Sequence, residues 1–132
     1  METAIDLAER LYAAVVKDDP APFLALCAFN AVIEYPAEGR LPYGGEWRGR
    51  QGIEQFLTAH DAAEEIVVFE PIDMIASGST VVVIGRFEGK TKPGSATWST
   101  KFVHVLAFSD GLLDRWEAFF DTAAAVEAHG RH

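Results

Sequence analysis

The stretch ATWSTKFVHVLAFSDGLLDRWEAFFDT, residues 96–122, decides the fold of this chain. Alternate positions over residues 98–108 share one face of a predicted strand, and this face is mostly apolar. Its residues are Trp98, Thr100, Phe102, His104, Leu106 and Phe108. The run Ser109-Asp110-Gly111 is typical of a hairpin turn, and residues 112–120 form the returning strand. Two long paired strands with one apolar face need a second layer to cover it.

The segments upstream predict the rest of the sheet and the first helix. Val, Ile and Phe dominate residues 66–76 and 80–88, which the turn Ser77-Gly78-Ser79 joins into another hairpin. Nearer the start of the chain, apolar residues at three- and four-residue spacing predict a helix that Thr3 caps and residues 18–20 end.

The remaining predicted elements are a short apolar helix at 23–29, a strand at 31–35, a loop over 36–50, a helix over 51–60 and a terminal helix at 122–128. This order indicates an α+β protein. We predict one domain over residues 1–132, in which a curved antiparallel sheet wraps around three N-terminal helices. The open end of this cone would hold an apolar pocket.

Composition and charge narrow the function. The chain has 132 residues, 49% of them hydrophobic, which suits one domain with a buried core. A formal charge of −9 repels a phosphate backbone, so we expect no nucleic-acid partner. No apolar run reaches the ~18 residues of a membrane span, and the acidic N-terminus does not resemble a signal peptide. We expect a soluble cytoplasmic protein with a small-molecule ligand and no membrane partner.

Two segments resemble a known family. Residues 42–53, PYGGEWRGRQGI, and residues 102–122 are similar to the SnoaL-like branch of the nuclear-transport-factor-2-like superfamily, with the same order of elements along nearly the whole chain. The resemblance implies a cone-shaped fold with a deep apolar pocket and a homodimer built across the sheet. The superfamily includes ketosteroid isomerases, polyketide cyclases, dehydratases, epoxide hydrolases and proteins that bind without chemistry, so the activity must be argued from the site.

Comparison within the superfamily selects catalytic candidates. Where ketosteroid isomerases have an Asp base before a Pro, this chain has Tyr35, and a phenol is a poor base, which disfavours classical steroid isomerisation. Polyketide cyclases resemble the chain in having a His on the penultimate strand and an Asp at the end of the last one, here His104 and Asp121. That resemblance implies that Asp121 moves a proton, His104 stabilises an enolate oxygen and Tyr35 donates a hydrogen bond.

Limonene epoxide hydrolase offers a weaker match. It resembles the chain over residues 116–121 and at Arg86-Phe87-Glu88. Arg86 and Asp121 would supply two members of that family's Asp–Arg–Asp set, and Glu88 would replace the third with a longer side chain. We rank this hypothesis below the cyclase-like one.

The remaining site predictions concern ligand contacts. We expect these from Trp98, Glu117, Arg86, Tyr12, Phe102, Trp116, Phe119, His60 and Trp47. The four His residues are scattered, with His129 and His132 in a frayed tail, and Cys27 is the one cysteine, so we expect no metal and no other cofactor.

Several of these residues also have a structural interpretation. Asp121 could simply cap the terminal helix, and His104 could be a packed core histidine. Glu117 either shares a face with Asp121 or lies at a rim beside Arg115. His60 also suits a packed boundary position, and Arg86 an ion pair.

Three hypotheses of function follow. The first is a cofactor-free isomerase, cyclase or dehydratase acting on an apolar small molecule through Asp–His acid–base chemistry. The alternative is a non-catalytic ligand-binding or dimeric interaction module, and the third is an epoxide hydrolase. The enzyme hypothesis requires that Asp121 and His104 face a common cavity.

Overall fold

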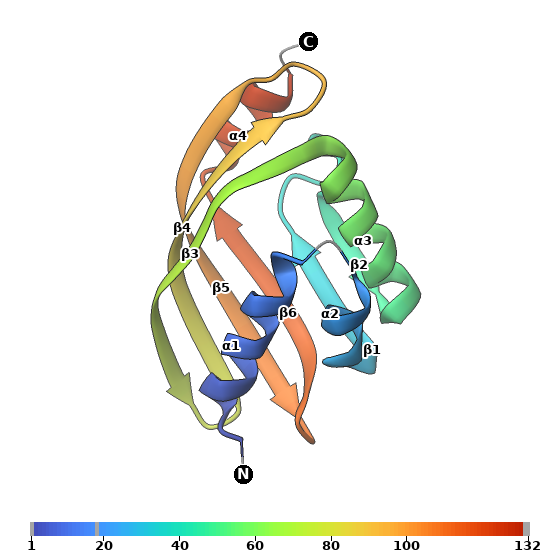
Figure 1. The fold of residues 1–132 in the computed structure, drawn as a ribbon, viewed down its shortest axis with the longest axis vertical. Helices are drawn as coiled ribbons and strands as arrows, with labels where there is room; N and C mark the ends of the chain where they lie inside the picture. Colours follow the sequence, from blue (N-terminus) through green and yellow to red (C-terminus); the bar gives the residue numbers. More distant parts are fainter. Residues whose placement is uncertain (1, 18, 131–132) are drawn as a thin grey trace.

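The computed structural model describes residues 2–17 and 19–130. The helices are α1 (Ala4–Val15), α2 (Ala21–Ala25), α3 (Gly49–Ala63) and α4 (Thr122–His129). The strands are β1 (Cys27–Tyr35), β2 (Gly45–Arg48), β3 (Glu64–Ser77), β4 (Thr80–Thr91), β5 (Thr97–Ser109) and β6 (Leu112–Phe120). Figure 1 shows the predicted α+β cone, an unclosed curved sheet with α1, α2 and α3 on its concave side.

The sheet has the order β2-β1-β6-β5-β4-β3. Neighbouring strands are antiparallel except for β1 and β6, which run parallel with Val32 opposite Arg115. Here the sheet departs from the purely antiparallel one that we predicted. A parallel pair needs a long connection, and the chain between β1 and β6 supplies it through α3 and the hairpins of β3, β4 and β5.

The first helix forms as its sequence predicts. The side chain of Thr3 accepts a hydrogen bond from the backbone N–H of Asp6, and the Asp6 carboxylate accepts one from the backbone of Thr3. This capping box satisfies N–H groups that the first helical turn leaves free. Of the stop predicted at residues 18–20, Asp18 lies outside the described residues, and Asp19 caps the backbone N–H of Ala21.

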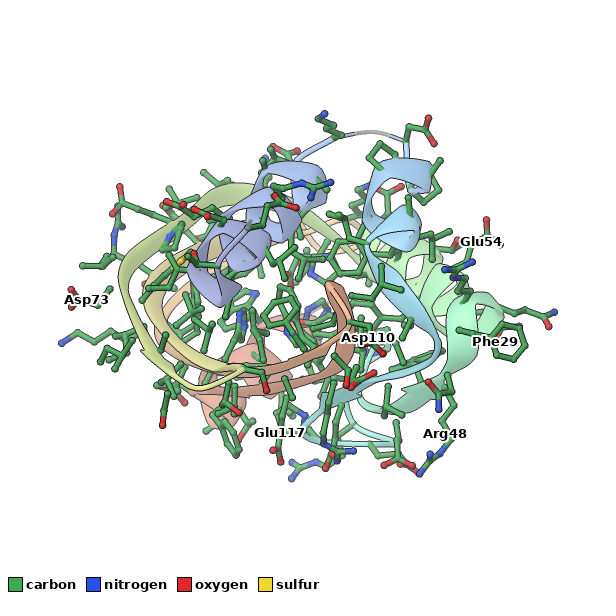
Figure 2. All side chains as sticks on the ribbon, turned by 90° about the horizontal axis from the view of Figure 1, so that it is seen from below. Phe29, Arg48, Glu54, Asp73, Asp110 and Glu117 are labelled. Carbon is green, nitrogen blue, oxygen red and sulfur yellow. The ribbon has the colours of Figure 1, made fainter. Side chains whose placement is uncertain are left out.

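Two local predictions are wrong. The helix predicted at 23–29 ends at Ala25, and β1 starts at Cys27 instead of residue 31, so that Phe29 lies in a strand with 85% of its surface exposed (Figure 2). Short runs of apolar residues do not distinguish a helix from a strand. The predicted loop over 36–50 contains β2, whose residues Gly45–Arg48 pair with β1.

The junction of α3 and β3 positions the site described below. The helix is longer than the predicted 51–60, and the chain passes directly from Ala63 into β3 at Glu64. Glu64 has an extended backbone, and its N–H donates to the carbonyl of His60. No helix within the described residues combines the length and the apolar character that a membrane crossing requires.

Candidate functional site

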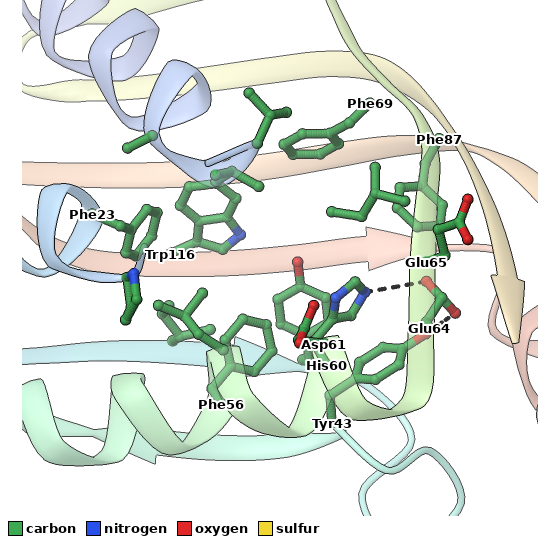
Figure 3. Close-up of a pocket in the computed structure, with 18 of the residues that line it drawn as sticks. Phe23, Tyr43, Phe56, His60, Asp61, Glu64, Glu65, Phe69, Phe87 and Trp116 are labelled. Carbon is green, nitrogen blue, oxygen red and sulfur yellow. Dashed lines mark hydrogen bonds and ion pairs between the residues drawn. The ribbon is translucent and has the colours of Figure 1, made fainter. Parts of the chain in front are cut away.

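A cavity of about 460 Å³ lies between the helices and the concave face of the sheet (Figure 3). Its mouth is marked by exposed lining residues from the connection between α1 and α2, the C-terminal half of α3, the start of β3 and the turn after β4. These residues are Lys17, Asp19, Thr58, Asp61, Glu65 and Lys92. The volume is in the range of pockets that enclose small organic ligands.

Aromatic rings form most of the inner wall. They are Phe23, Tyr35, Tyr43, Phe56, Phe69, Phe87, Trp98, Phe102, Trp116 and Phe120. The rings pack against one another, as in the pairs Phe69–Phe102 and Tyr35–Phe56, whose centroids are 5.4 and 4.7 Å apart. Rings held in this way give a ligand flat surfaces to pack against without rearranging first.

His104 is a polar group on this wall. It projects inward from β5, is 2% exposed and stacks on Phe102 with centroids 4.2 Å apart. Burial lowers the pKa of His104 to about 3, so the ring is neutral at neutral pH.

Behind His104 lies the buried phenol of Tyr12, whose hydroxyl is 2.6 Å from Nδ1 of the imidazole. Burial raises the pKa of Tyr12 well above its ordinary range, with a smaller contribution from Tyr35, so the phenol keeps its proton. We assign Tyr12 as the donor, because the opposite assignment would leave a buried hydroxyl proton without an acceptor. The imidazole proton then sits on Nε2, and His104 is a neutral donor.

Trp116 adds a second N–H to the same wall. Its Nε1 is the one buried side-chain nitrogen or oxygen without a hydrogen-bond partner in the described part of the chain. The rings of Trp116 and His104 are 4.8 Å apart between centroids. An unsatisfied buried donor costs about 1–3 kcal/mol, so this N–H calls for an acceptor that a ligand can bring.

Tyr35 supplies a hydroxyl beside these groups. Its ring centroid is 6.5 Å from that of His104. Burial raises the pKa of Tyr35 above its ordinary value, and the negative charge of Glu64 adds to the rise. The Trp116 N–H opposes this rise but lies outside hydrogen-bonding geometry with the phenol. His104, Trp116 and Tyr35 are hereafter called the donor group.

A buried carboxylate lies on another part of the cavity wall. Glu64 is 1% exposed, and its Oε1 accepts hydrogen bonds from Trp98 Nε1 at 2.9 Å and from the Tyr43 hydroxyl at 3.1 Å. Nε2 of His129 lies 2.6 Å from the same oxygen, and Nε2 of His60 lies 3.1 Å from Oε2. We call these five residues the Glu64 cluster.

The cluster keeps Glu64 ionised. Burial by itself raises the pKa of a carboxyl group. Hydrogen bonds from His129, His60 and Trp98, with the electrostatic attraction of His60 when that ring is protonated, outweigh burial and lower the pKa of Glu64 to about 2. The described residues contain no group of His, Cys, Asp and Glu side chains arranged to hold a metal ion.

Six of the predicted site residues line the cavity: His104, Tyr35, Trp98, Phe102, Trp116 and His60. A seventh, Tyr12, contacts His104 from behind.

The remaining predicted site residues lie elsewhere, and Asp121 is the most important correction. Trp116 and Phe120 line the cavity from β6, so the alternation along this strand turns Asp121 outward, as it does Glu117 and Phe119. Oδ1 of Asp121 accepts the N–H of Ala124 and caps α4, and this side chain is exposed outside the cavity. The requirement that Asp121 and His104 face one cavity is therefore not met.

Four ligand contacts that we predicted are also displaced. Glu117 and Phe119 alternate with the inward Trp116 and Ala118, so they lie on the convex face of the sheet, where Figure 2 shows Glu117. Arg86 is exposed on that face, opposite Glu70.

Trp47 donates its N–H to the carbonyl of Tyr43 and packs against Phe56 outside the cavity.

Sequence reasoning missed Glu64, Tyr43 and the role of His129. His129, which we placed in a frayed tail, has a side chain only 6% exposed and bound to Glu64, while His132 lies outside the described residues. Spacing gave a partial signal: His60 and Glu64 are four apart, which places two helical side chains on one face.

Residues 8–128 match the model of the SnoaL-like domain. Among solved structures, the chain is similar to an NTF2-like protein from Burkholderia xenovorans, with 24% identity, a TM-score of 0.87 and coverage of 96% of this chain and 95% of that one. It is similar to TerC, co-crystallised with polyporic acid, with 27% identity, a TM-score of 0.82 and coverage of 96% and 98%. A polyketide cyclase candidate from Pseudomonas putida matches at 18% identity and a TM-score of 0.79, over 97% and 98% of the chains. No curated protein matches the sequence.

Proposed function

Since the chain belongs to the SnoaL-like family, we propose that it binds an apolar, aromatic small molecule in its cavity and acts on it as a cofactor-free isomerase, cyclase or dehydratase. The observation that carries the proposal is the donor group. His104, Trp116 and Tyr35 line one cavity, and the indole N–H has no acceptor in the described protein. A ligand oxygen would satisfy these donors.

The lining supports the choice of ligand. Flat aromatic walls favour a ligand with fused or linked rings, and few polar groups are available to orient it. TerC, which shares this fold, was crystallised with polyporic acid, an aromatic hydroxyquinone. We propose a ligand of similar character: rings for the wall, and a carbonyl or enol oxygen for the donor group.

The donors also suit catalysis. When a carbon next to a carbonyl loses a proton, negative charge develops on the oxygen, and fixed donors in a site that excludes water stabilise that charge. Neutral donors interact more strongly with the charged oxygen than with the uncharged ketone, which is the condition for lowering a barrier. Enolisation of this kind is a step common to isomerisation, cyclisation and dehydration.

One observation favours the non-catalytic alternative. Asp121, the predicted acid–base residue, caps α4 outside the cavity. If no other base served the cavity, the protein would bind its ligand without chemistry. The epoxide hydrolase hypothesis is disfavoured on the same ground, because neither Arg86 nor Asp121 lines the cavity.

We also propose that the protein is a homodimer through the convex face of the sheet. Phe119 is 49% exposed there, and Val103 is its partner in the β5–β6 register. In the next strand, Ile84 pairs with Val103 and extends the apolar surface. An exposed apolar area of this kind marks an interaction surface.

A binding experiment tests the ligand proposal. The probe is 2-naphthol, a flat bicyclic compound whose oxygen resembles that of an enol, titrated into the intact protein by calorimetry. Tyr35→Phe and Trp116→Phe each remove one donor, and we expect each to weaken binding by about 2- to 10-fold, the value of one hydrogen bond.

Tyr43→Phe is the matched control, because it removes a hydroxyl from the same wall that already donates to Glu64. Its affinity for 2-naphthol should stay close to that of the wild type. Absence of binding by the wild-type protein, or equal losses in Tyr35→Phe and Tyr43→Phe, would contradict the proposal.

A further inference from the structure

We infer that His60 is the general base of the cavity and that Glu64 is the positioning residue that orients it. This inference rests on the proposed function and supplies the proton acceptor that Asp121 does not provide. The two residues lie at the junction of α3 and β3, on the cavity wall close to its mouth (Figure 3).

The junction fixes the His60 ring twice. The backbone N–H of Glu64 donates to the carbonyl of His60, and the side chains meet at 3.1 Å between Nε2 and Oε2. The other oxygen of Glu64 is held by Trp98, Tyr43 and His129, so the carboxylate cannot swing away with the imidazole. A base that is itself oriented by a fixed third group is the arrangement that proton transfer requires.

The hydrogen bond also determines which nitrogen is the base. An ionised carboxylate only accepts hydrogen bonds, so Nε2 of His60 must carry a proton. In the neutral ring the lone pair then lies on Nδ1. This atom has no hydrogen-bond partner among the described residues, and it is not one of their fully buried polar atoms. Figure 3 shows the ring with one nitrogen joined to Glu64 and the other turned away from it.

The surroundings of His60 are mostly aromatic. The edge of Tyr43 meets the ring with centroids 4.7 Å apart, and Phe56 and Phe87 each lie at 6.3 Å. The neighbouring charged groups are Glu64, which is buried, and Asp61, which is exposed and faces Lys92 at the mouth. His60 itself is 17% exposed at its side chain, so a ligand in the cavity can reach it.

The other members of the cluster are poor candidates for the base. Glu64 has both oxygens occupied by donors. His129 binds Glu64 with its Nε2, but it does not line the cavity and comes from α4 behind the carboxylate. His60 and His129 therefore make the same kind of contact with Glu64, and one of them lines the cavity. That difference provides a matched control.

The reaction used as a test is hydrogen–deuterium exchange at C1 of 2-tetralone, a bicyclic ketone, in D₂O. Nδ1 of His60 takes the C1 proton, and the electron pair of the C–H bond forms the C1–C2 double bond. The carbonyl π pair moves to the oxygen, which faces the donor group. The proton on Nδ1 then exchanges with D₂O, and transfer of a deuteron from Nδ1 to C1 restores the ketone, so no oxidant, reductant or cofactor takes part. NMR follows the loss of the C1 proton signal.

We expect His60→Gln to lower kcat for exchange by about 10²- to 10⁴-fold, the usual contribution of a general base, with little change in KM or in 2-naphthol affinity. His129→Gln removes a comparable bond to the same carboxylate, but Trp98 and Tyr43 still hold Oε1, so this variant should retain most of the exchange rate. Glu64→Gln should lower kcat while its binding of 2-naphthol persists, since Glu64 hydrogen-bonds His60 and no member of the donor group.

A spectroscopic measurement on the wild-type protein tests the same inference without relying on the folding of any variant. In ¹⁵N NMR of the wild-type protein, neutral His60 should show a protonated Nε2 and an unprotonated Nδ1. The opposite tautomer overturns the inference. So does exchange that survives His60→Gln within a factor of about two, or a wild-type protein that binds 2-naphthol without exchanging 2-tetralone. Failure to bind 2-naphthol at all overturns the proposed function and, with it, this inference.

Discussion

The buried His104 makes the stability of the fold depend on pH in a predictable way. Its pKa is about 3 in the folded protein and 6.5 in an unfolded chain. Below the unfolded value, the unfolded state binds a proton that the folded state does not, so protons favour unfolding. The stabilisation by neutral His104 is complete above pH 6.5 and is lost as the pH falls toward 3. By this linkage, the free energy of unfolding should fall by about 2 kcal/mol between about pH 7.5 and about pH 5.

Urea unfolding of the wild-type protein and of His104→Gln over this pH range measures the effect. Glutamine does not titrate, so the free energy of unfolding of the variant should fall by about 2 kcal/mol less than that of the wild type. His104→Gln also loses the hydrogen bond to Tyr12, but this cost is the same at every pH. It therefore cancels when the change in unfolding free energy with pH is compared between the two proteins. Parallel curves for the two proteins would refute the assignment of His104 as a buried neutral imidazole.

Three further predictions concern residues outside the acid–base chemistry. Asp121→Ala should lower the free energy of unfolding in urea by about 1 kcal/mol, because it removes the α4 cap. Calorimetry should find 2-naphthol binding unchanged, and a loss of binding would mean that Asp121 belongs to the binding site. Tyr12→Phe should cost about 0.5–1.5 kcal/mol and let His104 change tautomer, which ¹⁵N NMR detects; an unchanged tautomer would mean that Tyr12 does not fix it. Phe119→Lys should convert the proposed dimer to monomer in analytical ultracentrifugation, while the exposed control Phe29→Lys should not; equal behaviour of the two variants would exclude the convex face as the interface.

The parts of the fold that sequence predicts well are those with a strict alternation. In β5 and β6, burial alternates along the strand because one face covers the core, so the inward positions of Trp98, His104 and Trp116 are readable from spacing. The resemblance to polyketide cyclases, not the spacing, led to the wrong expectation for Asp121. The inward positions of β6 are Trp116, Ala118 and Phe120, so the same alternation turns Asp121 away from the cavity.

The Glu64 cluster was not predictable by such a rule. Glu64 and Glu65 are adjacent acidic residues, typical of a solvated junction, and only Glu64 is buried. Its partners come from distant segments: Tyr43 before β2, Trp98 in β5 and His129 in α4. Buried carboxylates need donors, but which donors meet is decided by the tertiary fold.

The arrangement of charge in the cavity links the two proposals. A buried carboxylate would ordinarily repel the negative charge that develops on an enolate oxygen. Here the charge of Glu64 is spread over hydrogen bonds from Trp98, Tyr43 and His129, and His60 lies between the carboxylate and the ligand space. Once His60 accepts a proton, it forms an ion pair with Glu64, and the local charge is neutralised as the enolate forms. The carboxylate thus stabilises the protonated base, while the donor group stabilises the oxygen, so both interactions strengthen in the same step.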